Sequence, residues 1–387
     1  MKRAFKPEEI ERVVVRGANW VGDAVMTVPA LRELRRVLPG ARVTLATRAW
    51  AEGVFDGADF LDDLLVVGGD GRGVGSFVRQ VSAWRARRFD LAVLLPNAFA
   101  PALVAFAARV PLRVGHATDG RAPLLTHPLA VPGWRGKRHE VFYYLNVVAE
   151  LERALYGSTS VPPGDDAPGE LFGTRPAALR GAARAASRAP APSTDVVVSA
   201  ERREAARGLL RSRGVGFEHP VVALCPGSTN SRAKRWPAER FAALADLLAE
   251  RAGAQVLLIG SREELEVSEA VSRLTRRRPV MLTGQTDLAQ TVALLSVADL
   301  LVTNDTGPAH LAAAVARPVV VIFGPTDPTT TRPFTPLAEL VREPPACAPC
   351  MLRDCPIDHR CMTAVTPEAV YARAARALER FGAEVAR

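Results

Sequence analysis

Residues 300–314 read LLVTNDTGPAHLAAA, a polar cluster between two apolar runs. The first four residues predict a short buried strand, and the last four predict the opening of a helix. Open α/β folds collect ligand-binding groups at such a turn, where free backbone N–H groups and the helix dipole attract anions. The alternative is that Asp305 or Thr306 only caps the helix. The side chains that could reach one ligand from this turn are Asn304, Asp305, Thr306 and His310.

The same alternation of apolar strands and amphipathic helices recurs along the chain and predicts an α/β fold with parallel sheets. A length of 387 residues suggests two domains. We place an N-terminal Rossmann-like domain at residues 1–157, a Pro/Ala-rich linker at 158–194 and a C-terminal Rossmann-like domain at 195–365. A short helix is expected in the linker near 177–186. A last helix follows at 366–387, with Thr366 as its N-cap. Within these domains we expect a helix at 24–37, and strands at 300–302 and 319–323 that complete the second sheet.

Composition describes a folded soluble protein, since 48% of residues are apolar and 24% are charged. No apolar stretch is long enough to span a bilayer, and the N-terminus lacks the apolar core of a signal peptide. We therefore expect a cytoplasmic protein. The net charge of +9 favours an anionic partner such as a nucleotide, a phosphorylated lipid surface or nucleic acid. A GC-rich coding bias toward arginine would explain the charge equally well.

The first strand-to-helix turn, residues 16–25, reads RGANWVGDAV. It contains no GxGxxG, so the dinucleotide-binding fingerprint is absent. Instead a carboxylate, Asp23, follows the first strand at the mouth of a helix. This carboxylate can act as a general base if it lies within reach of an acceptor hydroxyl. Its alternative role is to cap the helix.

The second domain opens with a strand that leads into CPGSTNSRAKRWP at residues 225–237. Its small residues let backbone N–H groups approach phosphate oxygens, and Lys234 adds a positive charge. The loop is not a Walker A motif, and a solvated basic loop is the alternative. After the next strand, residues 260–264 offer a carboxylate that could accept hydrogen bonds from ribose hydroxyls. Helix capping is again the alternative.

Four of the five cysteines cluster between residues 347 and 361, with His359 among them. In a cytoplasmic chain this spacing favours a metal over disulfides. A structural zinc ion held by four cysteines, or by three cysteines and His359, is chemically reasonable. Unliganded or disulfide-paired cysteines remain the alternative. The candidate ligands are Cys347, Cys350, Cys355 and Cys361.

Three separated segments together resemble the ADP-heptose–lipopolysaccharide heptosyltransferases of glycosyltransferase family 9, with the heptosyltransferase II members nearest. These segments are 19–23 (NWVGD), 225–237 and 303–310 (TNDTGPAH), and 95–99 (LPNAF) adds support. The resemblance covers nearly the whole chain except the linker and the cysteine-rich insertion at 347–361.

The resemblance implies an inverting, metal-independent glycosyltransferase with a GT-B fold, in which two Rossmann-like domains face a cleft. The family's general base falls on Asp23, and its donor-binding acid falls on Glu264, with Glu263 as a neighbouring candidate. Catalysis would need no cofactor, and any zinc would be structural. The remaining donor-binding positions are Ser228, Thr229, Lys234, Asp305, Thr306, Gly307 and His310.

The implied partners are an ADP-heptose donor and an anionic lipopolysaccharide-precursor acceptor, heptosyl-Kdo-lipid A, at the cytoplasmic face of the inner membrane. The protein would attach there peripherally through basic groups of the first domain, and we expect no nucleic-acid partner. Two alternatives stay open: a GT-B sugar-nucleotide epimerase, and a basic nucleic-acid-binding protein with a four-cysteine zinc knuckle. The candidate acceptor contacts are Arg113, His116, Arg121, Lys137, Arg138 and His139, with a solvated surface as their alternative.

Overall fold

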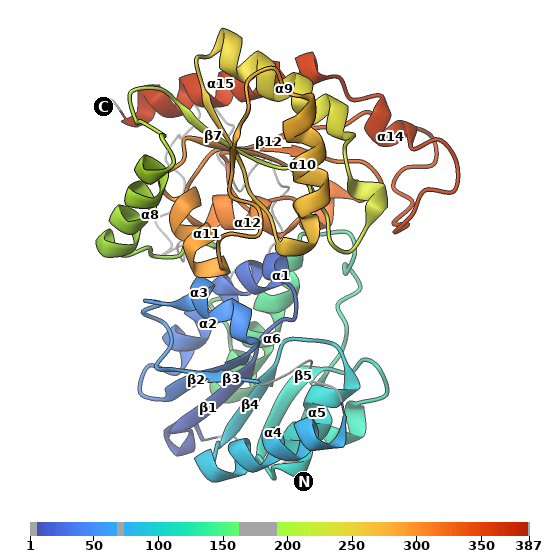
Figure 1. Ribbon diagram of the computed structural model, residues 1–387. Helices are drawn as coiled ribbons and strands as arrows, with labels where there is room; N and C mark the ends of the chain where they lie inside the picture. Colours follow the sequence, from blue (N-terminus) through green and yellow to red (C-terminus); the bar gives the residue numbers. More distant parts are fainter. Residues whose placement is uncertain (1–5, 68–72, 162–191, 386–387) are drawn as a thin grey trace, which may run out of the picture. The chain divides into compact units, whose positions relative to one another are not determined.

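The computed structural model describes residues 6–67, 73–161 and 192–385 (Figure 1). The chain divides into two compact units. Unit 1 holds residues 1–52 and 58–194, and unit 2 holds residues 53–57 and 195–387. Each unit has its own parallel six-stranded sheet. The linker helix predicted near 177–186 lies outside the described residues.

The sheet of unit 1 has the strand order β3-β2-β1-β4-β5-β6, and all neighbouring strands are parallel. The chain thus leaves β1 toward one edge of the sheet and then returns to build the other half from β4. The strands are β1 (Arg12–Arg16), β2 (Arg42–Thr47), β3 (Asp63–Val66), β4 (Leu91–Leu94), β5 (Leu112–His116) and β6 (His127–Leu129).

Helices cover both faces of this sheet. On one face α4 and α5 pack on the sheet, where Trp84 of α4 joins Val14 and Leu94 in the core. On the other face α2 packs beside α6. The single helix predicted at 24–37 is two helices, because Pro29 lacks an N–H group and lies in the first turn of the second one. The helices are α1 (Val21–Met26), α2 (Val28–Val37), α3 (Glu52–Phe55), α4 (Val74–Arg87), α5 (Phe99–Ala107) and α6 (Glu140–Tyr156), with short 3-10 turns at Pro7–Glu9, Ala49–Ala51 and Ala122–Leu124.

Unit 2 repeats the topology, with the strand order β12-β11-β10-β7-β8-β9 and parallel pairing throughout. The prediction that residues 319–323 complete the sheet was wrong. A further edge strand, β12, pairs with β11 and is only half-buried along most of its length. The strands are β7 (Val221–Cys225), β8 (Gln255–Leu258), β9 (Val280–Met281), β10 (Leu300–Asn304), β11 (Val319–Ile322) and β12 (Ala338–Val341).

The core of unit 2 forms where α9, α10 and α15 pack on one face of the sheet around Trp236 and Phe241, whose rings meet edge to face at 4.9 Å. Thr366 caps α15 as predicted, because its Oγ1 accepts the N–H of Ala369 at 3.2 Å. The helices are α8 (Ala200–Ser212), α9 (Ala238–Arg251), α10 (Leu265–Leu274), α11 (Leu288–Leu295), α12 (Gly307–Ala314), α13 (Pro328–Thr331), α14 (Arg360–Thr363) and α15 (Pro367–Val385), with 3-10 turns η5 (Arg232–Lys234) and η6 (Arg262–Glu264).

Both units therefore have the doubly wound strand order, in which the two central strands lead to opposite edges. In such sheets the loops after the central strands separate and leave a crevice at their carboxyl ends. The central pairs are β1 and β4 in unit 1, and β7 and β10 in unit 2. Within the described residues, no helix is long and apolar enough to cross a membrane.

Candidate active-site residues in the two units

The loops after β7 and β10 meet at the topological switch point of unit 2. Lys234 lies on η5, in the loop after β7, and Asp305 directly follows β10. The Lys234 Nζ lies 2.8 Å from the Asp305 Oδ2 and also donates to the Asp305 carbonyl at 3.1 Å. Thr326 donates its hydroxyl to the same Oδ2 at 2.7 Å. The carboxylate is 5% exposed and the lysine side chain 26% exposed, so a buried anion holds a cation that still reaches solvent.

Asn304 does not have the ligand-contacting role predicted for it. Its side chain is fully buried, and its Nδ2 donates to the carbonyls of Pro226 and Gly227 at 2.9 and 3.1 Å. Its Oδ1 accepts the N–H of Trp236 at 3.0 Å. Asn304 therefore ties both ends of the Lys234 loop to the end of β10. Both of its N–H donors are used, and its fully buried oxygen is not accessible to a ligand.

Helix α12 begins at this switch point. Thr306 occupies its N-cap position but makes no side-chain capping bond, and its hydroxyl instead shares a 3.3 Å hydrogen bond with Thr303. Thr306 therefore does not cap α12 through its side chain. The first N–H groups of a helix lack partners within the helix, and the dipole there favours an anion. With Gly307 at the first helical position, the turn can take a phosphate group beside Lys234.

His310 lies one turn into α12 and is 5% exposed. Burial lowers its pKa to about 4, although Asp305 opposes this shift and Lys234 adds to it. The imidazole is therefore neutral near pH 7, and it lies within the field of the Lys234–Asp305 pair. Its predicted contact with a donor would therefore be made by a neutral hydrogen-bonding group and not by a cation.

The buried His310 should make the protein less stable in mild acid. Below the unfolded pKa of 6.5 the unfolded chain binds a proton that the folded chain excludes until its pKa of about 4. Stability is therefore lost as the pH falls through this window, by at most about 3 kcal/mol for this residue. We expect the urea midpoint of His310→Gln to fall less between pH 7.5 and pH 5 than that of the wild type.

His219, which is exposed, provides the matched control for this prediction. His219→Gln should keep the acid sensitivity of the wild type, because it removes a histidine that folding does not bury. An unchanged pH dependence in His310→Gln would show that this imidazole does not bind protons differently in the folded and unfolded states. His116 also has a pKa lowered to about 4 and contributes the same background to every variant.

Glu264 lies beside the loop that carries Ser228 and Thr229. Its Oε2 accepts the N–H of Ser261 at 2.8 Å in a capping box. One of its two carboxylate oxygens therefore has the helix-capping role that was the alternative prediction. Its Oε1 accepts the Thr229 hydroxyl at 3.3 Å. A Cβ on Gly227 would lie 2.2 Å from the Glu264 Cδ, which explains why glycine occupies this position. The neighbouring Glu263 is exposed, so Glu264 is the better candidate.

Ser228 is nearly buried, and its carbonyl accepts the Nε and Nη2 of Arg235 at 3.2 and 3.1 Å. Arg235 thus fixes the loop backbone while Lys234, the residue before it, points to Asp305. The structure brings together the predicted donor-binding residues Lys234 and Asp305 with Thr306, Gly307 and His310 of α12, and it joins Thr229 to Glu264.

In unit 1 Asp23 lies in the first turn of α1, directly after β1. The hydroxyl of Tyr144, on α6, donates to the Asp23 Oδ1 at 3.2 Å. Burial raises the pKa of Tyr144 well above its usual value, and the Asp23 and Glu140 carboxylates raise it further. Tyr144 therefore stays protonated and can orient the carboxylate. Glu140, whose pKa is raised by burial and by Asp23 and lowered by Arg135, is a second acid in this neighbourhood.

Most of the predicted acceptor contacts are instead parts of the framework. Arg121 is fully buried and donates to the carbonyls of His116, Pro96 and Ala98. His116 is fully buried, stacks on Tyr143 at 4.1 Å and bonds Asn146. Arg113 donates to the Leu124 carbonyl, and His139 caps α6.

Cations that can meet an acceptor lie in the loop before α6. Lys137 is exposed, and Arg138 is half-buried with its guanidinium 5.2 Å from the centre of the Trp134 ring. Arg135, which was not predicted, is exposed and lies 4.5 Å from the centre of the Tyr143 ring. Because Arg135 also shifts the pKa of Glu140, it lies near the Asp23 neighbourhood.

The sequence profile of glycosyltransferase family 9 (heptosyltransferase) matches residues 77–360. The chain belongs to this family. Lipopolysaccharide heptosyltransferase 2 of Salmonella typhimurium is 30% identical over 341 residues, covering 86% of this chain and 88% of that protein. Lipopolysaccharide heptosyltransferase 2 of Escherichia coli is 28% identical with the same coverage.

Solved structures agree on the fold. Escherichia coli ADP-heptose lipopolysaccharide heptosyltransferase II has a TM-score of 0.76 at 24% identity, covering 95% of this chain and 99% of that one. Escherichia coli heptosyltransferase WaaC with ADP has a TM-score of 0.64 at 17% identity, covering 95% and 99%. The GT-B fold class and the family resemblance are confirmed, and the protein is a glycosyltransferase. The epimerase alternative has no support in this family assignment.

In this family 9 chain the cysteine-rich segment contacts the loop at residues 225–237, which carries Lys234. The Arg353 carbonyl accepts the N–H of Ala233 at 2.9 Å and the hydroxyl of Ser231 at 3.1 Å. The Nε2 of His359 lies 2.6 Å from the Ala233 carbonyl, and Asp354 pairs with the exposed Arg232. These contacts of the cysteine-rich segment fix the backbone of η5, on which Lys234 lies.

The metal site suggested by the cysteine spacing is not formed in this structure. Among the described residues, no three His, Cys, Asp or Glu side chains are placed to hold a metal ion, and the five cysteines are free thiols. Cys361 is drawn into the core beside Gly324, whereas Cys347 is exposed. Burial and the neighbouring Cys355, Cys350 and Cys347 raise the pKa of Cys361, so the four thiols lie in one neighbourhood, and a structural zinc ion there stays a prediction. The nucleic-acid alternative has no support in the family assignment.

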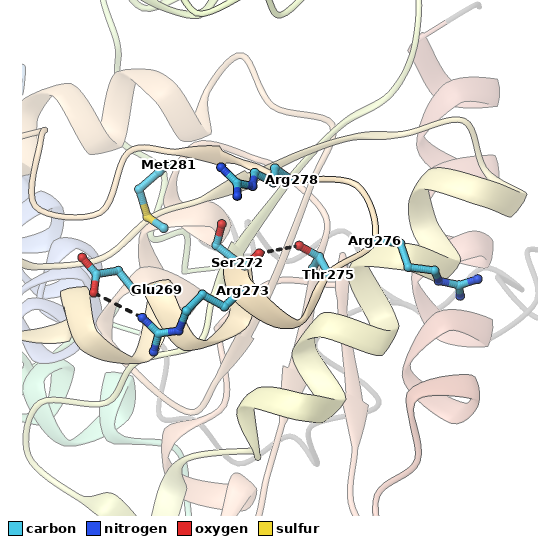
Figure 2. Close-up of a pocket in the computed structure, with 7 residues that line it drawn as sticks. All are labelled: Glu269, Ser272, Arg273, Thr275, Arg276, Arg278 and Met281. Atoms are coloured by element: carbon cyan, nitrogen blue, oxygen red, sulfur yellow. Dashed lines mark hydrogen bonds and ion pairs between the residues drawn. The ribbon is translucent and has the colours of Figure 1, made fainter.

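A cationic hollow of about 410 Å³ lies elsewhere in unit 2, between α10 and β9 (Figure 2). Most of its lining residues lie on α10 or in the loop before β9, and Met281 lies in β9 itself, so the hollow is away from the switch-point loops. Arg273 pairs with Glu269 at 3.7 Å, and Arg276 points away from the others and pairs with Asp246 and Glu250. The hollow lies at the C-terminal end of α10, where the helix dipole disfavours an anion, so it is a weaker anion site than the Lys234 turn at the N-terminus of α12.

Proposed function

We propose that the protein transfers L-glycero-D-manno-heptose from ADP-heptose to the lipopolysaccharide inner core, with heptosyl-Kdo-lipid A as acceptor and inversion at the anomeric carbon. The main support is the 30% identity to lipopolysaccharide heptosyltransferase 2 of Salmonella typhimurium, which extends over 86% of this chain. The side-chain arrangement at each switch point supplies the chemistry that such a transfer needs.

Unit 1 supplies the base. Asp23 accepts the proton of the acceptor hydroxyl, whose oxygen then attacks the anomeric carbon as the bond to the diphosphate breaks. Tyr144 donates its hydroxyl to the Asp23 Oδ1 and so orients the carboxylate. Arg135 and Lys137 are exposed cations of the same unit and suit the negative charges of the acceptor.

Unit 2 supplies the charge that stabilises the leaving diphosphate. Lys234 and the N-terminus of α12 offer positive charge and N–H donors at one point, so the transition state gains electrostatic stabilisation as ADP departs. Ser228 and Thr229 lie on the adjoining loop, and Glu264 is placed for the ribose hydroxyls. We propose that this chemistry takes place at the cytoplasmic face of the inner membrane, with the protein attached peripherally.

The direct test measures ADP release from ADP-heptose in the presence and absence of heptosyl-Kdo-lipid A. We expect release only with both substrates, together with a product heavier by one heptose. ADP-glucose should be a poor donor, and Kdo-lipid A without its first heptose a poor acceptor. Acceptor-independent release, or transfer to the shorter acceptor alone, would contradict the proposal.

A further inference from the structure

The outward side of α4 and α5 carries exposed apolar side chains. Val74 and Val78 on α4 are 80% and 56% exposed, and Phe99 and Phe106 on α5 are 41% and 49% exposed. The two helices pack side by side on the same face of the unit 1 sheet (Figure 1). Residues three, four or seven apart share one face of a helix, so each pair forms a line along its helix.

These exposures are not a failure of core packing, because each helix has a separate inward face. On α4, Phe77, Val81 and Trp84 pack into the core cluster, and on α5 Ala102 and Ala105 do so. The outward apolar residues are therefore additional to those that hold the helices on the sheet. Adjacent exposed apolar side chains of this size indicate a contact surface.

The charge around this surface is almost wholly positive. Residues 73–113 contain six arginines and a single carboxylate, Asp90, whose Oδ2 accepts two backbone N–H groups. Two nearby carboxylates are also engaged: Asp63 lies 4.0 Å from Arg87, and Asp119 accepts the N–H of Phe99. The arginines are Arg79, Arg85, Arg87, Arg88, Arg109 and Arg113. Arg113 is held by the Val110 and Leu124 carbonyls, so the other five are the ones offered to lipid phosphates.

A hollow of about 250 Å³ adjoins the N-terminal half of α4. It combines an apolar lining with the cation of Arg79. Trp84 also lines it, and within the described residues the buried indole N–H of Trp84 has no hydrogen-bond partner. An apolar hollow with one cation suits a group that is part anionic and part hydrocarbon. Its lining residues are Leu65, Val66, Val67, Ser76, Arg79, Gln80, Ala83 and Trp84.

We propose that this α4–α5 face docks unit 1 onto an anionic lipid bilayer. Apolar side chains enter the boundary between headgroups and acyl chains, and the surrounding arginines meet lipid phosphates. The N-termini of α4 and α5 follow β3 and β4, so they lie at the same edge of the sheet as Asp23. The proposal rests on the proposed function for its purpose, since docking would bring the catalytic unit to an acceptor anchored in that bilayer.

Vesicle binding by the full-length protein tests the docking itself. The wild type should co-sediment with phosphatidylcholine–phosphatidylglycerol vesicles and much less with pure phosphatidylcholine. The double variants Val78→Ser/Phe106→Ser and Arg79→Gln/Arg87→Gln should each bind the anionic vesicles at least about tenfold more weakly. Val197→Ser/Leu274→Ser removes two comparably exposed apolar side chains from unit 2 and should bind like the wild type.

Turnover provides a second measurement that separates docking from catalysis. Val78→Ser/Phe106→Ser should transfer heptose to a water-soluble, deacylated acceptor at the wild-type rate and to a vesicle-embedded acceptor more slowly. Vesicle binding by this variant equal to the wild type, or an equal loss in the unit 2 control, overturns the docking surface. Failure of the wild type to transfer heptose to any acceptor would count against the proposed function alone, because vesicle binding is measured without substrate.

Discussion

Asp23→Asn is expected to lower the transfer rate by about a hundredfold to ten-thousandfold while ADP-heptose binds almost as tightly as to the wild type. The asparagine has nearly the same shape and can still accept the Tyr144 hydroxyl at the Oδ1 position. It cannot take a proton from the acceptor hydroxyl. Steady-state rates give the loss of turnover, and calorimetric titration with ADP-heptose gives donor affinity. Equal losses of binding and turnover would argue against the base role.

Two further variants sharpen this test. Tyr144→Phe removes only the hydrogen bond to the Asp23 carboxylate and should cause a smaller loss of turnover, with donor affinity unchanged. Asp59→Asn removes an exposed carboxylate in the same unit and should behave like the wild type. If Tyr144→Phe equalled Asp23→Asn in effect, the hydroxyl itself would be part of the chemistry and not only a positioning group.

Lys234→Met is expected to weaken ADP binding by about tenfold to a hundredfold, because it removes a charge-assisted contact to the diphosphate. Turnover should fall further, since the leaving group gains negative charge in the transition state. The substitution also leaves Asp305, which is 5% exposed, without its cation. Lost activity could then reflect a disturbed loop and not a lost phosphate contact.

The double variant Lys234→Met/Asp305→Asn separates these two effects. It removes the buried charge together with its partner and retains an acceptor for the Thr326 hydroxyl. If Lys234 contacts the diphosphate, the double variant should bind ADP as weakly as Lys234→Met. Recovery of wild-type affinity in the double variant would show that the lysine serves only to neutralise Asp305. Thermal unfolding of all three proteins reports whether the loop is intact.

The central strands could be predicted from the sequence because both of their faces are buried. The runs at 221–224 and 300–302 are continuously apolar, as is typical of strands covered on both sides. The edge strands β6 and β12 were not predicted. β12 contains Glu339 and is mostly half-buried, and β6 is three residues with a proline, so neither has an apolar run.

The positions of the loops after β7 and β10 were predicted, but the partners of their side chains were not, and donor binding by these loops stays a prediction. Position at a strand end identified Lys234 and Asp305 separately, but their ion pair joins residues 71 positions apart and depends on the order of the strands. Asn304 was predicted to contact a ligand for the same reason. Its three backbone partners belong to another loop, and their proximity cannot be read from the local sequence. Tyr144 and Arg135 carried no local signal, because their relation to Asp23 arises only when α6 packs beside α1.

The three hydrogen bonds of the Asn304 amide have a consequence for donor selectivity. They are made within the protein, so if this turn holds the donor diphosphate as we propose, the shape of the site is established when unit 2 folds and not when the nucleotide arrives. A matching donor then binds without a large loss of loop entropy. A donor of different length or curvature meets a rigid surface that cannot reshape around it. Selectivity among sugar nucleotides should therefore come from steric mismatch, and substitutions that loosen this amide should broaden the donor range.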